Sequence, residues 1–324
     1  MGGFLGFVWR QWTMKPKPLP STLSLQGKTA LITGANSGLG LEAARELISR
    51  RISRLILAVR DPSKGEAAKE DILSSSDASC TIEIWPLDHE SYASIAAFGQ
   101  RVRGLDRLDY ALLNAGVKMM KYEKSVAGHE MNVQINHLGT SAVSLTILPC
   151  LRRTARKINA PTRLTVVSSE GHFWIPFKER HAPHILARMD EPSSFGWQQQ
   201  RYYTTKLLNV LWTHELAARL RKEEVVVNSV NPGFCYSGLH RHSAGIIGVF
   251  LWLFAWTQRE GGWCLADAVV GHEGEHGAYL SEQRMTTPSS FVLSKEGEAV
   301  QKKVWDETIA VLRDEGKGVD TDIV

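Results

Sequence analysis

Short apolar segments alternate along this chain with longer amphipathic segments. Short runs rich in β-branched and aliphatic residues occur at TALITGA, RLILAVR, CTIEIWPLD, LDYALLNAG, RLTVVSS and VVVNSVNPG. Amphipathic, helix-like stretches lie between them, at Leu39–Arg50, Pro62–Leu73, Ser91–Arg103 and about Glu130–Leu151. Nearly continuous apolar strands that alternate with helices are typical of a parallel sheet buried on both faces. The pattern therefore predicts an α/β fold with a doubly wound parallel sheet.

One folded unit accounts for this pattern. The 324 residues are 43% hydrophobic and 22% charged, which is ordinary for a globular chain and sufficient for one large core. The sequence contains no internal repeat and no convincing linker. We therefore expect a single domain over residues 26–324, preceded by an N-terminal arm over residues 1–25.

Charge and cysteine usage exclude some classes of function. The 38 basic and 34 acidic residues are interleaved along the chain, so no block of like charge indicates a nucleic-acid-binding face. The four cysteines lie far apart and form no CxxC pair. Such usage favours reduced thiols in the cytoplasm over a disulfide framework.

The arm begins with MGGFLGFVWRQWTMKPKP, which is apolar and aromatic for nine residues and then basic. This run is shorter than the about 20 apolar residues needed to cross a bilayer, and it lacks a signal-peptide cleavage site. Two interpretations remain open. The arm packs on the protein's own surface, or it makes a weak, peripheral membrane contact through Trp9, Trp12 and their cationic neighbours.

The first predicted strand runs into a glycine-rich turn, TGANSGLG, with glycines at positions 34, 38 and 40. This spacing permits a tight turn and the close approach of a pyrophosphate, which the start of the following helix stabilises. Tight strand-to-helix turns also use glycine for purely structural reasons. The place of this turn, on the first strand of an alternating pattern, favours nucleotide binding.

The second strand ends in LAVRD, and the charge at this tip bears on the choice of cofactor. An acidic residue there binds the ribose 2′-hydroxyl of NAD, whereas an arginine can bind the 2′-phosphate of NADP. Arg60 precedes Asp61, which favours NADP(H), with Lys64 as an assisting cation. In the alternative interpretation, Arg60 is a surface residue and Asp61 caps the helix that starts at Pro62.

Polar or small residues also follow the third and fourth strands. Asp88 is expected to accept a hydrogen bond from an adenine amino group, to cap the next helix, or to do both. Asn114, Ala115 and Gly116 end the fourth strand, where small residues let the backbone lie against a cofactor. Asn136 lies inside an apolar helical stretch, where asparagine is unfavourable, so we expect it to have a specific partner.

The fifth strand and the stretch RYYTTKLLNVL contain the candidate catalytic groups. Ser168 and Ser169 stand at the strand end where doubly wound folds bind ligands, and only one of them can face the cleft. Tyr202 and Lys206 are four residues apart and share one helix face, whereas Tyr203 is turned about 100° away. A phenol acts as a base near pH 7 only if its pKa falls by about three units. A nearby cation such as Lys206, with an oxidised nicotinamide ring, supplies a shift of about that size.

Together these motifs resemble the short-chain dehydrogenase/reductase family over about residues 26–240. The resemblance is carried, in chain order, by Thr33-Gly34-x-x-x-Gly38-x-Gly40, Asp88, Asn114-Ala115-Gly116, Asn136, Ser169, Tyr202-x-x-x-Lys206 and Pro232-Gly233. The local sequences LAVRDPSKGEAA and INHLGT are similar to those of the retinol-dehydrogenase-like branch. MGGFLGF and VVSSEGHFW resemble its fungal members among natural-product tailoring enzymes. The resemblance implies a Rossmann-type fold.

The resemblance also implies a role for each matching residue. Tyr202 would be the general acid/base, and Lys206 would lower its pKa and hold the nicotinamide ribose. Ser169 would polarise the substrate oxygen, and Asn136 would anchor a water in a proton relay. The residues implied to bind the cofactor are Gly34, Asn36, Ser37, Gly38, Leu39, Gly40, Arg60, Asp88, Asn114, Ala115, Gly116, Tyr202, Lys206, Pro232, Gly233 and Ser237. Many NADP-dependent members have a basic residue where this chain has Asn36, so the expected NADP(H) preference rests mainly on Arg60.

Two further segments are expected to shape the substrate site. Family members place a substrate lid after the NPG motif, so residues 237–262 are expected to form a helical lid. Its apolar and aromatic residues suit a bulky hydrophobic substrate, although an interfacial membrane contact is the alternative. The insert over residues 172–200 is expected to form the opposite wall. Family members often form homodimers through the helices that hold Asn136 and Tyr202.

Two other functions match parts of the sequence. HEGEH, His272–His276, fits the zinc motif HExxH, but glycines interrupt the helix that such a site needs and no later histidine completes it. We therefore expect a solvated loop there and no metal. A non-catalytic NADP(H)-binding scaffold is the second alternative, against which the intact Ser169, Tyr202 and Lys206 argue. We expect an NADP(H)-dependent oxidoreductase that interconverts a carbonyl and an alcohol on a hydrophobic small molecule in secondary metabolism.

Overall fold

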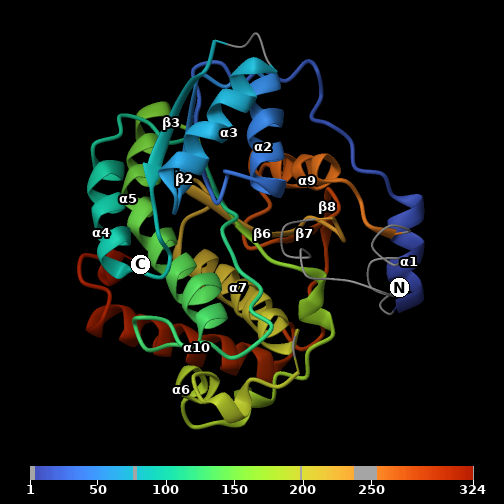
Figure 1. Ribbon diagram of the computed structural model, residues 1–324, viewed down its shortest axis with the longest axis vertical. Helices are drawn as coiled ribbons and strands as arrows, with labels where there is room; N and C mark the ends of the chain where they lie inside the picture. Colours follow the sequence, from blue (N-terminus) through green and yellow to red (C-terminus); the bar gives the residue numbers. More distant parts are fainter. Residues whose placement is uncertain (1–3, 76–78, 198, 237–253, 324) are drawn as a thin grey trace.

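A computed structural model describes residues 4–75, 79–197, 199–236 and 254–323 of the chain (Figure 1). The described strands form one eight-stranded sheet with the order β3-β2-β1-β4-β5-β6-β7-β8. All neighbouring strands run parallel except β7 and β8, which are antiparallel. The strands are β1 Thr29–Thr33, β2 Arg54–Val59, β3 Thr81–Pro86, β4 Tyr110–Leu113, β5 Thr162–Val167, β6 Val225–Asn231, β7 Tyr279–Ser281 and β8 Arg284–Thr286.

Helices connect most of these strands and cover the sheet. The α-helices are α1 Phe4–Thr13, α2 Gly38–Ser49, α3 Pro62–Ser74, α4 Tyr92–Arg103, α5 Thr140–Ile158, α6 Ile185–Met189, α7 Gln200–Arg219, α9 Gln258–Val270 and α10 Lys295–Asp314. A π-helix, η1 Val133–Gly139, runs directly into α5. Short 3-10 helices are η2 Glu170–Phe173, η3 Lys178–His181, η4 Pro192–Ser194 and η6 Thr321–Ile323.

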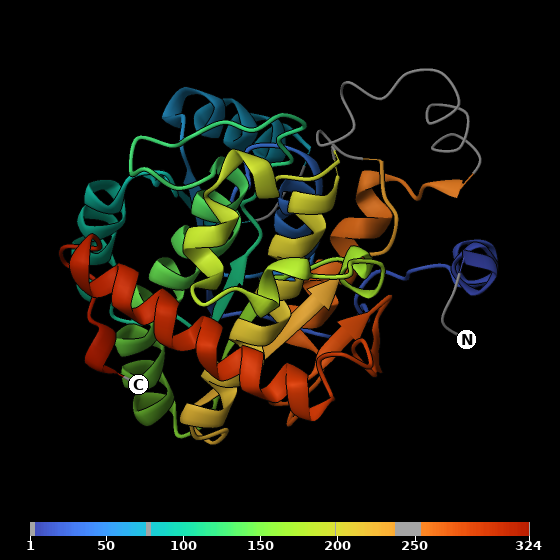
Figure 2. The ribbon, with the colours of Figure 1, turned by 90° about the horizontal axis from the view of Figure 1, so that it is seen from below.

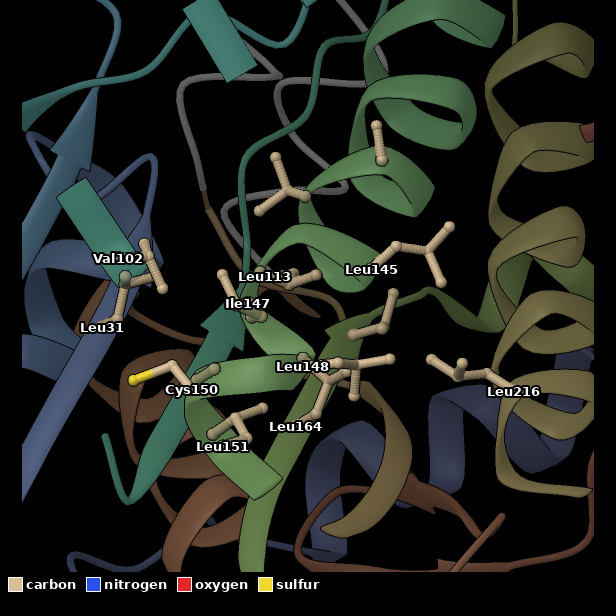
Figure 3. Close-up of a cluster of buried hydrophobic side chains, with 14 of the residues drawn as sticks. Leu31, Val102, Leu113, Leu145, Ile147, Leu148, Cys150, Leu151, Leu164 and Leu216 are labelled. Atoms are coloured by element: carbon tan, nitrogen blue, oxygen red, sulfur yellow. The ribbon is translucent and has the colours of Figure 1, made fainter. Parts of the chain in front are cut away.

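The sheet is buried on both faces because successive side chains of its strands point into two different helical layers. On β1, Leu31 packs into a cluster with α4, α5 and α7, whereas Ala30 and Ile32 pack with α2 and α9. Figure 3 shows part of the first cluster, where Leu113 and Leu164 from the sheet lie beside side chains of α5. The predicted doubly wound α/β architecture is confirmed.

Two segments depart from the sequence expectations. The predicted helix over about Glu130–Leu151 begins as η1 and continues in α5 to Ile158. The end of the expected lid, residues 258–262, instead starts α9, which packs closely on α2. A Cβ on Gly262 would lie only 2.4 Å from Glu42 Cβ, so these residues serve helix packing. The rest of the expected lid, residues 237–253 with Ser237, lies outside the described residues.

The N-terminal helix α1 lies at the periphery and packs on the rest of the chain (Figures 1 and 2). The buried Gln11 side chain donates hydrogen bonds to the carbonyls of Phe234 and Phe254, and Trp256 Nε1 donates to the Gln11 carbonyl. These bonds match the expectation of an arm packed on the protein's own surface. Trp9 and Trp12 remain exposed. In the described part of the chain, no helix is both long and apolar enough to span a bilayer.

The C-terminal helix α10 covers the helix that holds the candidate catalytic tyrosine. Figure 2 shows α10 crossing the molecule beside α7. Trp305 of α10 stacks on Trp212 of α7 with ring centroids 4.3 Å apart. Most residues of α7 are buried within this single chain. The helix expected to pair two copies in a homodimer is therefore already covered by the chain's own C-terminal helix.

Candidate active site

The motifs from the ends of β1 and β4 lie against each other. A Cβ on Gly34 would lie 2.9 Å from Ala115 Cα, and one on Gly40 would lie 2.5 Å from Asn114 Nδ2. Gly34 also has a φ of +65°, which side chains other than glycine rarely adopt. The glycine turn is therefore required by both close approach and backbone conformation. It brings the predicted Gly34–Gly40 and Asn114–Gly116 stretches together.

The hydroxyl of Thr33, to which the sequence assigned no role of its own, joins these two stretches. Thr33 Oγ1 accepts hydrogen bonds from the main-chain N–H groups of Asn114 and Ala115, at 3.0 and 2.9 Å. Asn114 Nδ2 donates in return to the carbonyls of Thr33 and Gly34. The place of Thr33 as the first residue of the glycine motif was a sequence signal for such a role. Its partners depend on the pairing of β1 with β4, which the sequence alone does not give.

The start of α2 fits a phosphate group. Its N-cap residue, Ser37, makes no side-chain capping hydrogen bond, and the first turn contains no acidic residue. The amide groups at this end therefore keep their donors for an anion, and the positive end of the helix dipole faces the same way. The space beside Gly38 is open, because a Cβ there would meet no atom within 4 Å. These features suit the pyrophosphate of a dinucleotide.

Arg60 and Asp61, which are adjacent at the tip of β2, have different roles in the structure. Asp61 is the N-cap of α3 and accepts hydrogen bonds from the Ser63 hydroxyl and from Ser63 N and Lys64 N. The bond from the hydroxyl, followed by the backbone bonds, lowers the pKa of its carboxyl. Lys64 Nζ also lies 3.6 Å from the Asp61 carboxylate. Arg60 is exposed, and no ion pair or hydrogen bond of its side chain occurs among the described residues. The capping interpretation of Asp61 is confirmed, and Arg60 remains available for a ligand.

Asp88 is not a helix cap, which corrects one of its two expected roles. Helix α4 starts at Tyr92 and is capped by Ser91, whose hydroxyl accepts from Ser94 N. Asp88 lies three residues earlier, and its Oδ1 accepts a hydrogen bond from Glu90 N at 3.0 Å. The Asp88 side chain is half-buried. It stabilises the turn between β3 and α4, and its adenine-binding role stays a prediction.

The two serines after β5 have different partners. Ser168 is buried and donates a hydrogen bond to the carbonyl of Lys206 at 2.8 Å, so it ties the strand end to α7. Ser169 is half-buried, and its Oγ accepts a hydrogen bond from Gly171 N at 3.2 Å. An accepted bond leaves the hydroxyl proton of Ser169 free to donate elsewhere. Of the pair, Ser169 is the one suited to bind a substrate oxygen.

The two tyrosines are also distinguished by their partners. Tyr203 donates its hydroxyl hydrogen bond to Gln199 Oε1 at 2.7 Å. Tyr202 is buried on the face of α7 that it shares with Lys206, whose Nζ lies 5.6 Å from the centroid of the Tyr202 ring. No hydrogen bond to the Tyr202 hydroxyl is found in the described ranges. This geometry favours Tyr202, as the helical spacing predicted.

Burial sets the charge state of both catalytic candidates on α7. Burial raises the pKa of Tyr202 above its ordinary value, and it lowers the pKa of Lys206 to about 8. Lys206 Nζ donates a hydrogen bond to the carbonyl of Val167 at 2.9 Å. Desolvation is the main cause of the raised pKa of the phenol in the protein without cofactor. The lowering of this pKa by Lys206, which the resemblance implied together with a bound nicotinamide, stays a prediction.

Asn136 has the specific partners that its place in the chain predicted. Its Oδ1 accepts from Val117 N at 2.8 Å, and its Nδ2 donates to the Val117 carbonyl and to Thr205 Oγ1. It lies in the π-helix η1, a geometry that recurs at functional sites. The side chain thus joins the loop after β4 to α7. One lone pair of Oδ1 remains for a water.

The insert before α7 packs against the start of that helix through an aromatic contact and a buried ion pair. Trp174 packs edge-on against Tyr203 with centroids 6.1 Å apart, and Tyr203 lies 5.7 Å from Tyr202. Arg201 is fully buried at the start of α7, where its Nη1 lies 3.2 Å from the Glu179 carboxylate. This ion pair holds the helix turn that carries Tyr202.

Other residues singled out in the sequence follow β6 and α9. Pro232 and Gly233 follow β6, and the ring of Trp256 packs directly on Gly233. His272 and His276 lie in a loop, as expected, with separate partners: His272 bonds Asp267, and His276 bonds the Ala217 carbonyl. No three potential metal ligands gather within the described ranges.

Known proteins share both the sequence and the fold. A family model described as short chain dehydrogenase matches residues 28–170. Short chain dehydrogenase sol3 of Alternaria solani is 54% identical over 286 residues, which cover 88% of this chain and 99% of that protein. Short chain dehydrogenase yanD of Aspergillus niger is 36% identical over 312 residues, 91% of this chain and 94% of its own length.

Two solved structures show the same fold at low identity. The RhlG/NADP active-site complex of Pseudomonas aeruginosa has a TM-score of 0.63 at 22% identity and covers 81% of this chain and 97% of that chain. L-sorbose reductase from Gluconobacter frateurii, complexed with NADPH and L-sorbose, has a TM-score of 0.61 at 16% identity and covers 82% and 98%. The sequence relatives span nearly the whole chain. They establish that it belongs to the short-chain dehydrogenase/reductase family, whose members are carbonyl/alcohol oxidoreductases.

Proposed function

We propose that this chain is an NADP(H)-dependent oxidoreductase that interconverts a carbonyl and an alcohol on a hydrophobic small molecule. One observation carries the proposal. Tyr202 is buried, and Lys206 Nζ lies 5.6 Å from the centre of its ring. Both residues are on α7, which a hydrogen bond from Ser168 attaches to the loop that contains Ser169. The resemblance of the sequence to fungal natural-product tailoring enzymes supports a step in secondary metabolism. The alternative function, a non-catalytic NADP(H)-binding scaffold, does not account for this arrangement of side chains.

Each side chain has a distinct task in carbonyl reduction. Bound NADPH supplies the hydride. The Ser169 hydroxyl, whose oxygen already accepts from Gly171 N, donates a hydrogen bond to the carbonyl oxygen and so polarises the carbonyl, without giving up its proton. Tyr202 donates the proton that completes the alcohol, and its raised pKa keeps it protonated at neutral pH. The pKa of Lys206, about 8, lets it hold or release a proton near pH 8 and so pass one toward Tyr202.

The charge states favour reduction over oxidation at neutral pH. A phenol whose pKa is raised is a ready proton donor but has to lose its proton before it can act as a base. Asn136 holds the loop after β4 against α7 and keeps one acceptor position for a water that connects Lys206 to solvent. We propose carbonyl reduction as the direction of the reaction, because a protonated Tyr202 is the proton donor that this direction needs.

The cofactor would be held by groups from several strand ends. The uncapped start of α2 fits the pyrophosphate, and Asn114–Gly116 would lie along the cofactor. A Cβ on Gly116 would lie only 3.7 Å from Lys206 Nζ, so this stretch passes directly beside the catalytic lysine. Exposed Arg60 at the tip of β2 is suited to the 2′-phosphate that distinguishes NADP from NAD. Asp88 would accept a hydrogen bond from the adenine.

The aromatic wall formed by Trp174 and Tyr203 supports a hydrophobic substrate. Because α10 already covers α7, we also propose that the enzyme works as a monomer rather than as a homodimer paired through that helix. Light scattering of the purified chain at micromolar concentration tests this. A mass of one 36.1 kDa chain is expected, and a dimer would contradict the covering role of α10.

A cofactor titration tests the proposed function without knowledge of the substrate. The ten tryptophans make binding visible as fluorescence quenching when NADPH or NADH is added. Tight NADPH binding and weak NADH binding are expected, followed by NADPH oxidation in a screen of hydrophobic ketones. If neither NADPH nor NADH binds, the proposal is contradicted. Tight NADPH binding with no turnover of any carbonyl compound would favour the scaffold function.

A further inference from the structure

A second lysine lies beside the catalytic tyrosine. Lys118 follows the Asn114–Gly116 stretch, and its Nζ lies 5.8 Å from the centroid of the Tyr202 ring. This is nearly the distance of Lys206 Nζ from the same ring, 5.6 Å. Two ammonium groups from different elements, the loop after β4 and α7, therefore converge on one phenol.

The backbone around Lys118 is held in place on both sides. Val117 exchanges two hydrogen bonds with the Asn136 side chain, at 2.8 and 2.9 Å. Met119 N donates to Asn132 Oδ1 at 2.9 Å. Asn132 and Asn136 are completely buried. The loop is therefore pinned to the η1 region, and Lys118 is not a freely moving surface lysine.

Lys118 has no counter-charge in the part of the chain that the structure describes. No carboxylate there lies within ion-pair distance of its Nζ, and its side chain makes no hydrogen bond to these residues. The side chain is half-buried, and burial lowers the pKa of its ammonium group. Lys206, by contrast, has the Val167 carbonyl as its partner. A half-buried cation without a counter-charge gains from an anion that enters its surroundings.

The nicotinamide end of a bound cofactor would supply no such anion, because its phosphates would be held at the start of α2. The remaining source is the substrate, which has to reach Tyr202 and Ser169 with its carbonyl group. An aromatic wall of Tyr203 and Trp174 lies on one side of Tyr202. The site therefore offers an apolar surface for the body of the substrate and a cation for one charged group.

We propose that Lys118 binds an anionic oxygen of the substrate, so that this enzyme selects hydrophobic carbonyl compounds that carry a carboxylate or an ionised enol or phenol. This inference rests on the proposed function. The negative oxygen lies within a few bonds of the reacting carbonyl, because Lys118 and the Tyr202 ring are neighbours. A charge-assisted hydrogen bond of this kind changes affinity by about 10- to 100-fold.

A binding experiment tests the proposal independently of turnover. The full chain is saturated with NADPH, and 1-naphthoate or its neutral isostere 1-naphthamide is then titrated while tryptophan fluorescence is followed. Wild type is expected to bind naphthoate at least about tenfold more tightly than naphthamide, K118M to bind the two equally, and K118R to keep part of the preference. Naphthoate that binds wild type no more tightly than naphthamide, or not at all, overturns the proposal. Failure of NADPH itself to bind would contradict the proposed function instead.

Kinetics separate a substrate contact from an effect on the tyrosine. With 4-acetylbenzoate and its methyl ester as substrates, K118M should lower kcat/KM for the acid by about 10- to 100-fold and leave the ester within about threefold. Equal losses for both substrates, with a shifted pH profile, would show that Lys118 acts through Tyr202 and would overturn the proposal. K121M, at a nearby exposed lysine, is the matched control and should change neither substrate. Circular dichroism and the Tm confirm that each variant is folded.

Discussion

Lys206 of α7 donates a hydrogen bond from Nζ to the main-chain carbonyl of Val167, the last residue of β5, at 2.9 Å. Asn209, one turn later on α7, donates to the same carbonyl. Ser169 follows Val167 by two residues, so the strand end that carries the serine is attached directly to the helix that carries Tyr202. One main-chain oxygen thus sets the relative position of the groups proposed to bind and protonate the substrate.

Replacement of Lys206 by methionine separates its role in activity from its role in stability. We expect K206M to lower kcat by about 100-fold or more, because the proposed proton supply to Tyr202 and the proposed contact with the nicotinamide ribose would both be lost. The Tm should stay unchanged or rise, since a desolvated ammonium group with a pKa of about 8 is removed from the interior. Steady-state kinetics and thermal unfolding measure the two effects. A large fall in Tm with little change in kcat would assign Lys206 a structural role.

The neighbouring tyrosines provide a matched pair of variants. Y202F should lower kcat by about three orders of magnitude while leaving NADPH affinity nearly unchanged, because only the proton donor is removed. Y203F loses one hydrogen bond to Gln199, which is worth about 1 kcal/mol of stability, and should keep most of its turnover. Single-turnover NADPH oxidation compares the two. Similar activities would mean that neither hydroxyl is the acid.

Arg60 is expected to discriminate between the two nucleotides. R60A should weaken NADPH binding by about 10- to 100-fold and change NADH binding little, because only NADPH has a 2′-phosphate. K64A is the control, since Lys64 is already close to the Asp61 carboxylate and should have a smaller effect. Fluorescence titrations give the dissociation constants. Equal losses for both nucleotides in R60A would contradict the phosphate assignment.

The N-terminal helix is expected to support the catalytic loop. Arg10 forms ion pairs with Glu170, which directly follows Ser169, and with the buried Glu282. Burial raises the pKa of both carboxyls, so they depend on this cation. R10M should destabilise the protein by about 1–3 kcal/mol and lower kcat more than it changes KM for NADPH, because the Ser169 loop loses its anchor. R10K should restore part of the loss.

Lysine 15 supplies the control for the arm. Lys15 is exposed, and no partner of its side chain occurs among the described residues, so K15M should match wild type in urea unfolding and in kinetics. An R10M variant that behaves like K15M would show that the arm is dispensable for the active site.

Buried His137 predicts a specific dependence of stability on pH. It lies in η1 beside Asn136, bonds Thr308 Oγ1 at 2.8 Å, and burial lowers its pKa to about 3. The unfolded chain takes up a proton below about pH 6.5 while the folded chain does not, so folding is weakened as pH falls through this window. H137Q lacks this effect, and its destabilisation relative to wild type should be smaller by about 2 kcal/mol at pH 5 than at pH 7. Urea unfolding at the two pH values measures the free energies of unfolding. If the difference between wild type and H137Q is the same at pH 5 and pH 7, His137 is not the group responsible for the pH dependence.

Strands β1 to β6 and helices α2 to α4 could be predicted from the sequence because local pattern and tertiary arrangement agree there. Each of β1 to β6 is an apolar run, and the helices predicted at Leu39–Arg50, Pro62–Leu73 and Ser91–Arg103 match α2, α3 and α4 within a residue or two. Strands β7 and β8 have three residues each, too few to show a periodicity. The expected lid was placed partly over α9, whose glycines serve close packing on α2 rather than a substrate.

The sequence by itself determined which residue types the site contains and the order in which they occur. Helical spacing was sufficient to choose Tyr202 over Tyr203, because i and i+4 share a face of any α-helix. Only the tertiary structure decided what those groups are able to do. The pKa of Tyr202 is raised because the folded chain excludes water from it, and Lys118 and Arg10 reach the site from distant segments. Burial and proximity between segments far apart in the chain depend on how strands pair and helices pack, which no local pattern encodes.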